Sequence, residues 1–144
     1  MITLNKEWKE DAMNHAIDCY PEECCGIVAI KNNKEFLWKC KNIAYEFKAT
    51  SFVIDPEDWA DCEDSVDKIV GIVHSHPDNE LEFSPTDKMS CKALNLTFYL
   101  VEPASDRIIK NRTIRGQMLR KIKVYGQLCS SFHVYTIYVS YGWI

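Results

Sequence analysis

The spacing of hydrophobic residues near the N-terminus predicts an amphipathic helix from Asn5 to Tyr20. Hydrophobic residues recur there at every fourth position, at Trp8, Ala12, Ala16 and Tyr20. Side chains four residues apart lie on one face of an α-helix, so this stripe should pack against the core. Asn5 suits the N-cap position, and Pro21 should end the helix because proline has no N–H for the helical hydrogen bond.

The rest of the chain carries short hydrophobic runs of strand length, separated by polar turns. We predict six strands, at Cys25–Ile30, Glu35–Cys40, Phe52–Ile54, Ile69–Val73, Leu96–Val101 and Arg107–Ile114. The first two should form a β-hairpin, because the turn between them contains two asparagines, which tolerate a positive φ. Residues 42–51 are expected to be a loop. Helices should run from Pro56 to about Lys68 and from Pro85 to Leu94, since proline fits the first helical position.

Length and composition indicate a single domain. With 144 residues, 47% hydrophobic and 26% charged, the chain can bury a sizeable core. The net charge of −4 argues against a general nucleic-acid binder, which is usually basic. No hydrophobic run approaches the roughly 20 residues of a transmembrane helix, and Met1–Lys6 has no signal-peptide pattern.

The cysteines favour a reducing compartment. There are 7 of them, an odd number, and no two form a C-x-x-C pair. This pattern is typical of buried thiols, and it argues against both a disulfide framework and a thiolate zinc site. We therefore expect a cytoplasmic protein.

The segment from Val70 to Asp87 combines candidate metal ligands. His74 and His76 follow a predicted strand, and residues two apart on a strand face the same side of the sheet. Pro77 should stop that strand. Asp87 lies in the first turn of the next predicted helix. Two imidazole nitrogens and one carboxylate oxygen, with a fourth position open, form the ligand set of a catalytic zinc ion.

Each part of this segment also has a simpler interpretation. A His-x-His pair at a strand end is often only exposed histidine. Ser84 is a good N-cap, Pro85 suits the first helical position, and Asp87 falls where the acidic residue of a capping box lies. Taken alone, residues 84–87 are better explained as a helix start than as part of a metal site.

A third feature, far upstream in the chain, favours the metal-site interpretation over the simpler ones. The sequence Tyr20-Pro-Glu-Glu-Cys-Cys-Gly26 precedes a hydrophobic run, and His74-Ser-His-Pro77 is followed by Ser84 and Asp87 at fixed distances. Together these residues resemble the motif of the JAMM (MPN+) zinc metallopeptidases over about residues 1–120. The context is most similar to the bacterial and phage branch, in particular to the N-terminal domain of tail-assembly proteins of lambda-like phages. The match selects Glu23, with Glu22 as the alternative if the register shifts by one.

The resemblance implies an α/β fold of the cytidine-deaminase-like JAMM sandwich, with a mostly antiparallel central sheet flanked by helices. It implies that His74, His76 and Asp87 bind Zn²⁺, which lowers the pKa of a bound water from 15.7 to about 7. Glu23 would accept a proton from that water and return it to the leaving amine. Ser84 would donate a hydrogen bond to the oxyanion. Ser75 should point away and be structural.

The implied reaction is hydrolysis of a peptide or isopeptide bond in a protein or peptide substrate that binds as an extended strand. The phage branch suggests a tail component as partner. The alternative is a non-catalytic scaffold or peptide-binding module that retains zinc. We expect residues 1–123 to form this domain, and residues 124–144 to be a C-terminal tail that is either a docking strand or a disordered remnant.

Overall fold

The chain folds into one five-stranded sheet with three helices. A computed structural model describes residues 7–78 and 81–112, and every structural statement below concerns these residues. The regular elements in chain order are α1 (Glu7–Cys19), β1 (Cys25–Lys31), β2 (Lys34–Cys40), α2 (Pro56–Ser65), β3 (Lys68–Ser75), α3 (Pro85–Leu94), β4 (Thr97–Glu102) and β5 (Arg107–Asn111). Two short 3₁₀ turns, η1 (Tyr45–Phe47) and η2 (Pro103–Ser105), lie in the connections.

The strands lie in the order β2-β1-β3-β4-β5. Only β3 and β4 are parallel, and the other neighbouring strands are antiparallel, so the predicted mostly antiparallel sheet is confirmed. The predicted hairpin is also present. Its turn residues Asn32 and Asn33 have φ of 52° and 62°, the left-handed conformation that a two-residue turn of this type requires.

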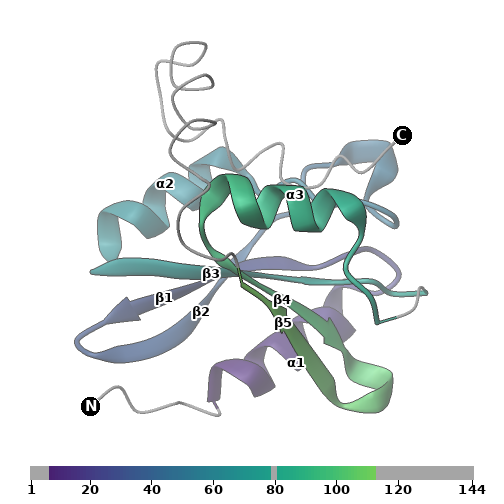
Figure 1. The fold of residues 1–144 in the computed structure, drawn as a ribbon, viewed down its shortest axis with the longest axis horizontal. Coiled ribbons are helices and arrows are strands. Elements are labelled where there is room, and N and C mark those ends of the chain that lie inside the picture. The colour runs from purple at the N-terminus through teal and green to yellow at the C-terminus, as the bar shows by residue number, and fades with distance from the viewer. Residues whose placement is uncertain (1–6, 79–80, 113–144) are drawn as a thin grey trace.

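Helices cover both faces of the sheet, which gives an α/β/α sandwich (Figure 1). Helix α1 lies on one face, where Trp8, Ala12 and Ala16 are buried against Val28 and Val73. Helices α2 and α3 lie on the other face. They contribute Trp59, Cys62 and Cys91 to a larger core with Ile27, Ile72, Phe98 and Leu100. The predicted stripe of the first helix is therefore confirmed except for Tyr20, which is 59% exposed because the helix ends at Cys19.

One predicted strand is absent, and the end of one predicted helix is wrong. Phe52–Ile54 is not a strand, since it makes only an isolated bridge between Ile54 and Asn42. Its side chains are fully or almost fully buried, so the hydrophobic pattern reported burial and not strand pairing. The second helix does not reach Lys68. The chain becomes extended at Val66, and Lys68 already pairs with Ile30 as the first residue of β3.

Some predictions fall on residues that the structure does not describe. These are the Asn5 cap, residues 113–114 of the last predicted strand and the C-terminal tail 124–144. The last strand itself ends earlier than predicted, since β5 ends at Asn111 and Arg112 lies outside it. Within the described residues no helix is long and apolar enough to cross a membrane. None of the six described cysteines forms a disulfide bond.

Candidate metal centre

The central strand and the start of a helix bring together the candidate metal ligands. His74 lies on β3, between Cys25 of β1 and Leu100 of β4, and is fully buried. His76 follows directly after the strand ends. Asp87 lies in the first turn of α3 and is 2% exposed. Strand pairing on both sides of β3 fixes the backbone of His74, so this ligand is held by the rigid centre of the fold.

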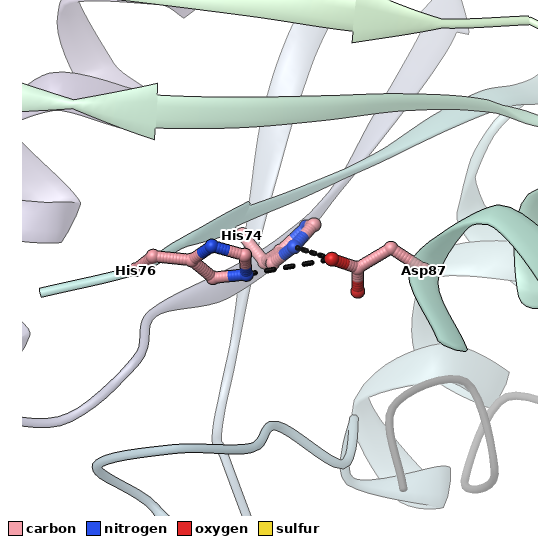
Figure 2. Close-up of side chains that lie close together, drawn as sticks. All are labelled: His74, His76 and Asp87. Atoms are coloured by element: carbon pink, nitrogen blue, oxygen red, sulfur yellow. Dashed lines mark ion pairs between the residues drawn. The ribbon is translucent and has the colours of Figure 1, made fainter. Parts of the chain in front are cut away.

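The three side chains converge on one point, as Figure 2 shows. Oδ2 of Asp87 lies 3.2 Å from Nε2 of His74 and 3.4 Å from Nε2 of His76. The ligand atoms of all three residues lie within 4.8 Å of one another. Ligands held at 2.0–2.1 Å around a tetrahedral ion are separated by about 3.3 Å, so both nitrogen–oxygen distances match those around a zinc ion.

The imidazole ring of His74 is buried, and its nitrogens lack hydrogen-bond partners in the described part of the chain. Neither Nδ1 nor Nε2 has a hydrogen-bond partner among the described groups. Nε2 lies close to the Asp87 oxygen but is too poorly aligned to donate to it. The ring stacks on Phe52, with centroids 4.7 Å apart. A buried nitrogen that lacks a hydrogen bond is costly unless something else, such as a cation, uses its lone pair. The donor set therefore fits a metal ion.

Asp87 serves at once as helix cap and as candidate ligand. Its Oδ2 accepts the Ser84 N–H at 2.8 Å, and its own N–H donates to Ser84 Oγ at 3.0 Å, which forms the predicted capping box. The same Oδ2 faces the two histidines. Burial alone would raise the pKa of the Asp87 carboxyl. His74, His76 and the Ser84 N–H outweigh burial and lower this pKa well below its usual range, which keeps the carboxylate ionised.

Glu23, not Glu22, points to the same place. Glu23 is 3% exposed, and its Oε1 lies 4.0 Å from Nε2 of His76. Burial, aided by the nearby charge of Asp87, raises the pKa of Glu23 to about 9. Glu22 instead pairs with Lys48 at 3.8 Å, on the partly exposed side of the segment. The geometry therefore favours the register that selects Glu23.

Ser75 lies between the two histidines and contacts the backbone. Its Oγ accepts the N–H of Cys24 at 2.9 Å, and its own N–H donates to the Cys24 carbonyl at 3.3 Å. These bonds connect the end of β3 to the segment that carries Glu23. This contact agrees with the structural role that we predicted for Ser75.

The sequence of this chain matches a known family. The model for prokaryotic homologs of the JAB domain matches residues 5–116. The chain belongs to this JAB-domain family. The match covers most of the chain and includes every residue of the candidate centre, so the family predicted from the motif is confirmed.

One relative of this JAB domain and one solved structure of similar fold extend the comparison. Tail tip assembly protein K of Escherichia phage N15 is 43% identical over 89 residues, which cover 62% of this chain and 36% of that protein. The match thus spans little more than a third of that relative. The solution structure of protein DSY2949 from Desulfitobacterium hafniense has a TM-score of 0.57 and 20% identity, over 83% of this chain and 97% of that one. This second likeness shows the fold alone.

Sequence reasoning missed Asn42 in this JAB domain. Its side-chain amide donates to the backbone carbonyl of Glu23 at 3.1 Å. Nothing in the sequence marks this residue, because Asn is common in loops and forms no recognisable pattern with Glu23 at that distance along the chain.

Proposed function

We propose that this JAB domain is a zinc-dependent peptidase that hydrolyses a peptide or isopeptide bond. The observation that carries the proposal is the convergence of His74, His76 and Asp87 on one point, with the buried Glu23 carboxyl beside it. Three protein ligands and an open position are typical of catalytic zinc, whereas structural zinc sites close the fourth position with protein. No fourth His, Cys, Asp or Glu joins this group among the described residues.

Each residue has a distinct role in the proposed reaction. His74, His76 and Asp87 would hold Zn²⁺, which would supply Lewis-acid polarisation and make a bound water acidic enough to react near neutral pH. Glu23 accepts a proton from the attacking water and later donates it to the leaving amine. Its buried position supports this role, because a carboxyl shielded from solvent holds a proton more readily than an exposed one.

Ser84 is the proposed donor to the oxyanion. In the capping box its Oγ is the acceptor, so the hydroxyl hydrogen is not used by the cap. One such donor is worth about 3 kcal/mol in the transition state. Ser84 is partly exposed, which leaves room for a substrate to approach.

We further propose that the substrate is a protein of a phage tail, and that the domain acts in the cytoplasm of the host. The proposal is supported by the likeness to tail tip assembly protein K of phage N15. We propose that the substrate binds as an extended segment, because main-chain hydrogen bonds can hold such a segment without regard to side-chain sequence.

The test combines metal analysis with hydrolysis of an internally quenched peptide library and of purified tail proteins. We expect one zinc per chain and zinc-dependent cleavage. Asp87→Ala should lose the metal, and Glu23→Gln should keep it but lower the rate by at least a hundredfold. Glu22→Gln is the matched control and should behave as the wild type. Zinc binding without any cleavage would reject the peptidase and favour the non-catalytic scaffold.

A further inference from the structure

The backbone of Glu23 is held by a loop and not by the sheet. Glu23 lies two residues before β1, outside regular secondary structure, so strand pairing does not fix its position. Its N–H donates to the Lys48 carbonyl at 2.7 Å, and its carbonyl accepts from Nδ2 of Asn42 at 3.1 Å. Both partners lie in the connection between β2 and α2. This connection therefore fixes the position of the Glu23 backbone, from which the side chain extends.

The connection is closed into a loop, residues 43–53, by backbone pairing at its base. The Ile43 N–H donates to the Val53 carbonyl at 2.9 Å, and the Asp55 N–H donates to the Lys41 carbonyl at 3.1 Å. A loop whose ends meet in this way needs internal contacts to fix its shape, because its backbone groups have no ladder to pair with.

Some of these contacts are backbone bonds within the loop, such as that from the Ser51 N–H to the Phe47 carbonyl at 2.8 Å, and the side chain of Asn42 supplies others. Besides its bond to Glu23, Nδ2 donates to the Ser51 carbonyl at 2.9 Å. Oδ1 accepts the N–H of Ala44 and the N–H of Val53, both at 3.0 Å. A primary amide has two donor hydrogens and two acceptor lone pairs. Asn42 uses all four in its four shortest bonds, three of them on the 43–53 loop and one on Glu23, and Nδ2 also donates a longer bond of 3.5 Å to the Lys48 carbonyl of the loop.

We propose that Asn42 is a positioning residue: its side-chain amide joins Glu23 to the 43–53 loop and thereby aims the Glu23 carboxyl at the metal site. The role of the aimed carboxyl as general base rests on the function proposed above. Aspartate has the shape of asparagine but no donor hydrogens, and glutamine is one methylene longer. Asparagine alone among the standard side chains offers this set of donors and acceptors at this length.

The metal ligands do not depend on this arrangement. No hydrogen bond described for Asn42 reaches His74, His76 or Asp87. These residues lie on β3, directly after it and on α3. Loss of the Asn42 donors should therefore misplace the base and leave the metal in place. Partners that orient catalytic groups typically cost ten- to hundredfold in activity when removed.

The first measurement needs no activity. Amide hydrogen exchange is followed by NMR in the wild type, Asn42→Ala and Asn42→Asp, with and without zinc. The Glu23 N–H donates to the Lys48 carbonyl, on the loop that Asn42 holds in shape. We therefore expect the Glu23 amide to exchange at least tenfold faster in both variants, while the amides of Ile27 and Val28 in β1 keep their wild-type rates. Asn42→Asp keeps the two acceptor bonds of the loop, so it isolates the donor side even if Asn42→Ala unfolds.

The second measurement uses zinc-loaded proteins and the library peptide that the wild type cleaves fastest. We expect both Asn42 variants to bind one zinc, to lose about ten- to hundredfold in kcat and to change KM by less than twofold. Asp55→Ala is the matched control. At the base of the same loop, the Asp55 side chain accepts a hydrogen bond from the Glu57 N–H. The substitution removes this bond and does not change any contact of Glu23. It should leave kcat and the Glu23 amide unchanged.

The outcomes separate this inference from the proposed function. A Glu23 amide with wild-type exchange in both Asn42 variants overturns the inference, as does a loss of kcat that follows loss of zinc or that Asp55→Ala reproduces. If the zinc-loaded wild type cleaves no peptide, the proposed function fails. The Glu23 N–H donates to Lys48 of the 43–53 loop, so its exchange rate then shows without any activity whether Asn42 keeps this loop bound to Glu23.

Discussion

Glu23→Gln should stabilise the metal-free protein, and the gain should grow with pH. Burial raises the pKa of Glu23 from 4.5 to about 9 in the folded protein. Between these two values the unfolded chain has lost the proton while the folded protein keeps it. The folded state then binds more protons, so the free energy of unfolding falls as pH rises. Glutamine has a similar shape and no proton to lose, so it removes this dependence.

The magnitude follows from the difference in pKa. Each pH unit within this interval costs about 1.4 kcal/mol of unfolding free energy. Wild type and Glu23→Gln should therefore have similar stability near pH 4.5. At pH 7 the variant should be more stable by about 3 kcal/mol, a large fraction of the stability of a domain of this size. Zinc should reduce this gain, because a neighbouring dication favours the ionised carboxylate.

The assay is equilibrium unfolding in urea, followed by tryptophan fluorescence in EDTA at several values from pH 5 to pH 8. Trp8 and Trp59 are buried on opposite faces of the sheet and report on both cores. Glu22→Gln is the control, since Glu22 pairs with Lys48 at the partly exposed surface. A constant difference between wild type and Glu23→Gln across this range would refute the reasoning, because it would mean that Glu23 is solvated and ionises normally.

Three further predictions concern other parts of the fold. Ser84→Ala should lower stability by about 1 kcal/mol through loss of the cap, whereas Ser84→Gly should cost only a few tenths. Both should lower kcat by a similar factor if the hydroxyl contacts the oxyanion, and unequal losses in kcat would reject that role. Burial lowers the pKa of His15 below 6.5, so its contribution to stability should be lost as pH falls below 6.5. The free energy of unfolding of His15→Gln, measured at several pH values, should not show this loss below pH 6.5. The same pH dependence in wild type and variant would contradict the role given to His15. Gly71→Ala should destabilise the protein by about 1–3 kcal/mol, because a Cβ there would lie 2.8 Å from the Thr97 carbonyl oxygen. Thermal unfolding would check this, and an unchanged melting temperature would show that β3 and β4 can move apart.

Local patterns in the sequence predicted much of the candidate site. The two-residue period of a strand placed His74 and His76 on one side, and the Ser84–Asp87 spacing predicted a capping box, which is present. Both patterns depend on residues close together along the chain. The order of the motif then linked them to the JAB-domain family, which the comparison confirmed.

Tertiary contacts decided what the sequence left open. Glu22 and Glu23 are adjacent and chemically alike, and the contacts that distinguish them, those of Lys48, Asn42 and Ser75 with this segment, are made by residues far away along the chain. The same limit explains the error at Phe52–Ile54. A hydrophobic run indicates that side chains are buried. Whether its backbone pairs with a strand depends on the position that the 43–53 loop gives this segment in the fold.

Helix capping and metal binding were alternatives at the level of sequence, but the structure combines them. One oxygen, Oδ2 of Asp87, accepts the Ser84 N–H and also faces His74 and His76. The hydrogen bond that begins α3 therefore also orients the candidate ligand, and it leaves a second lone pair of that oxygen for a cation. Ligands held by β3 and by a capped helix are rigid, whereas Glu23 depends on a loop. Substitutions in the 43–53 loop should consequently affect the rate of reaction, and substitutions at the cap should affect both the metal and the fold.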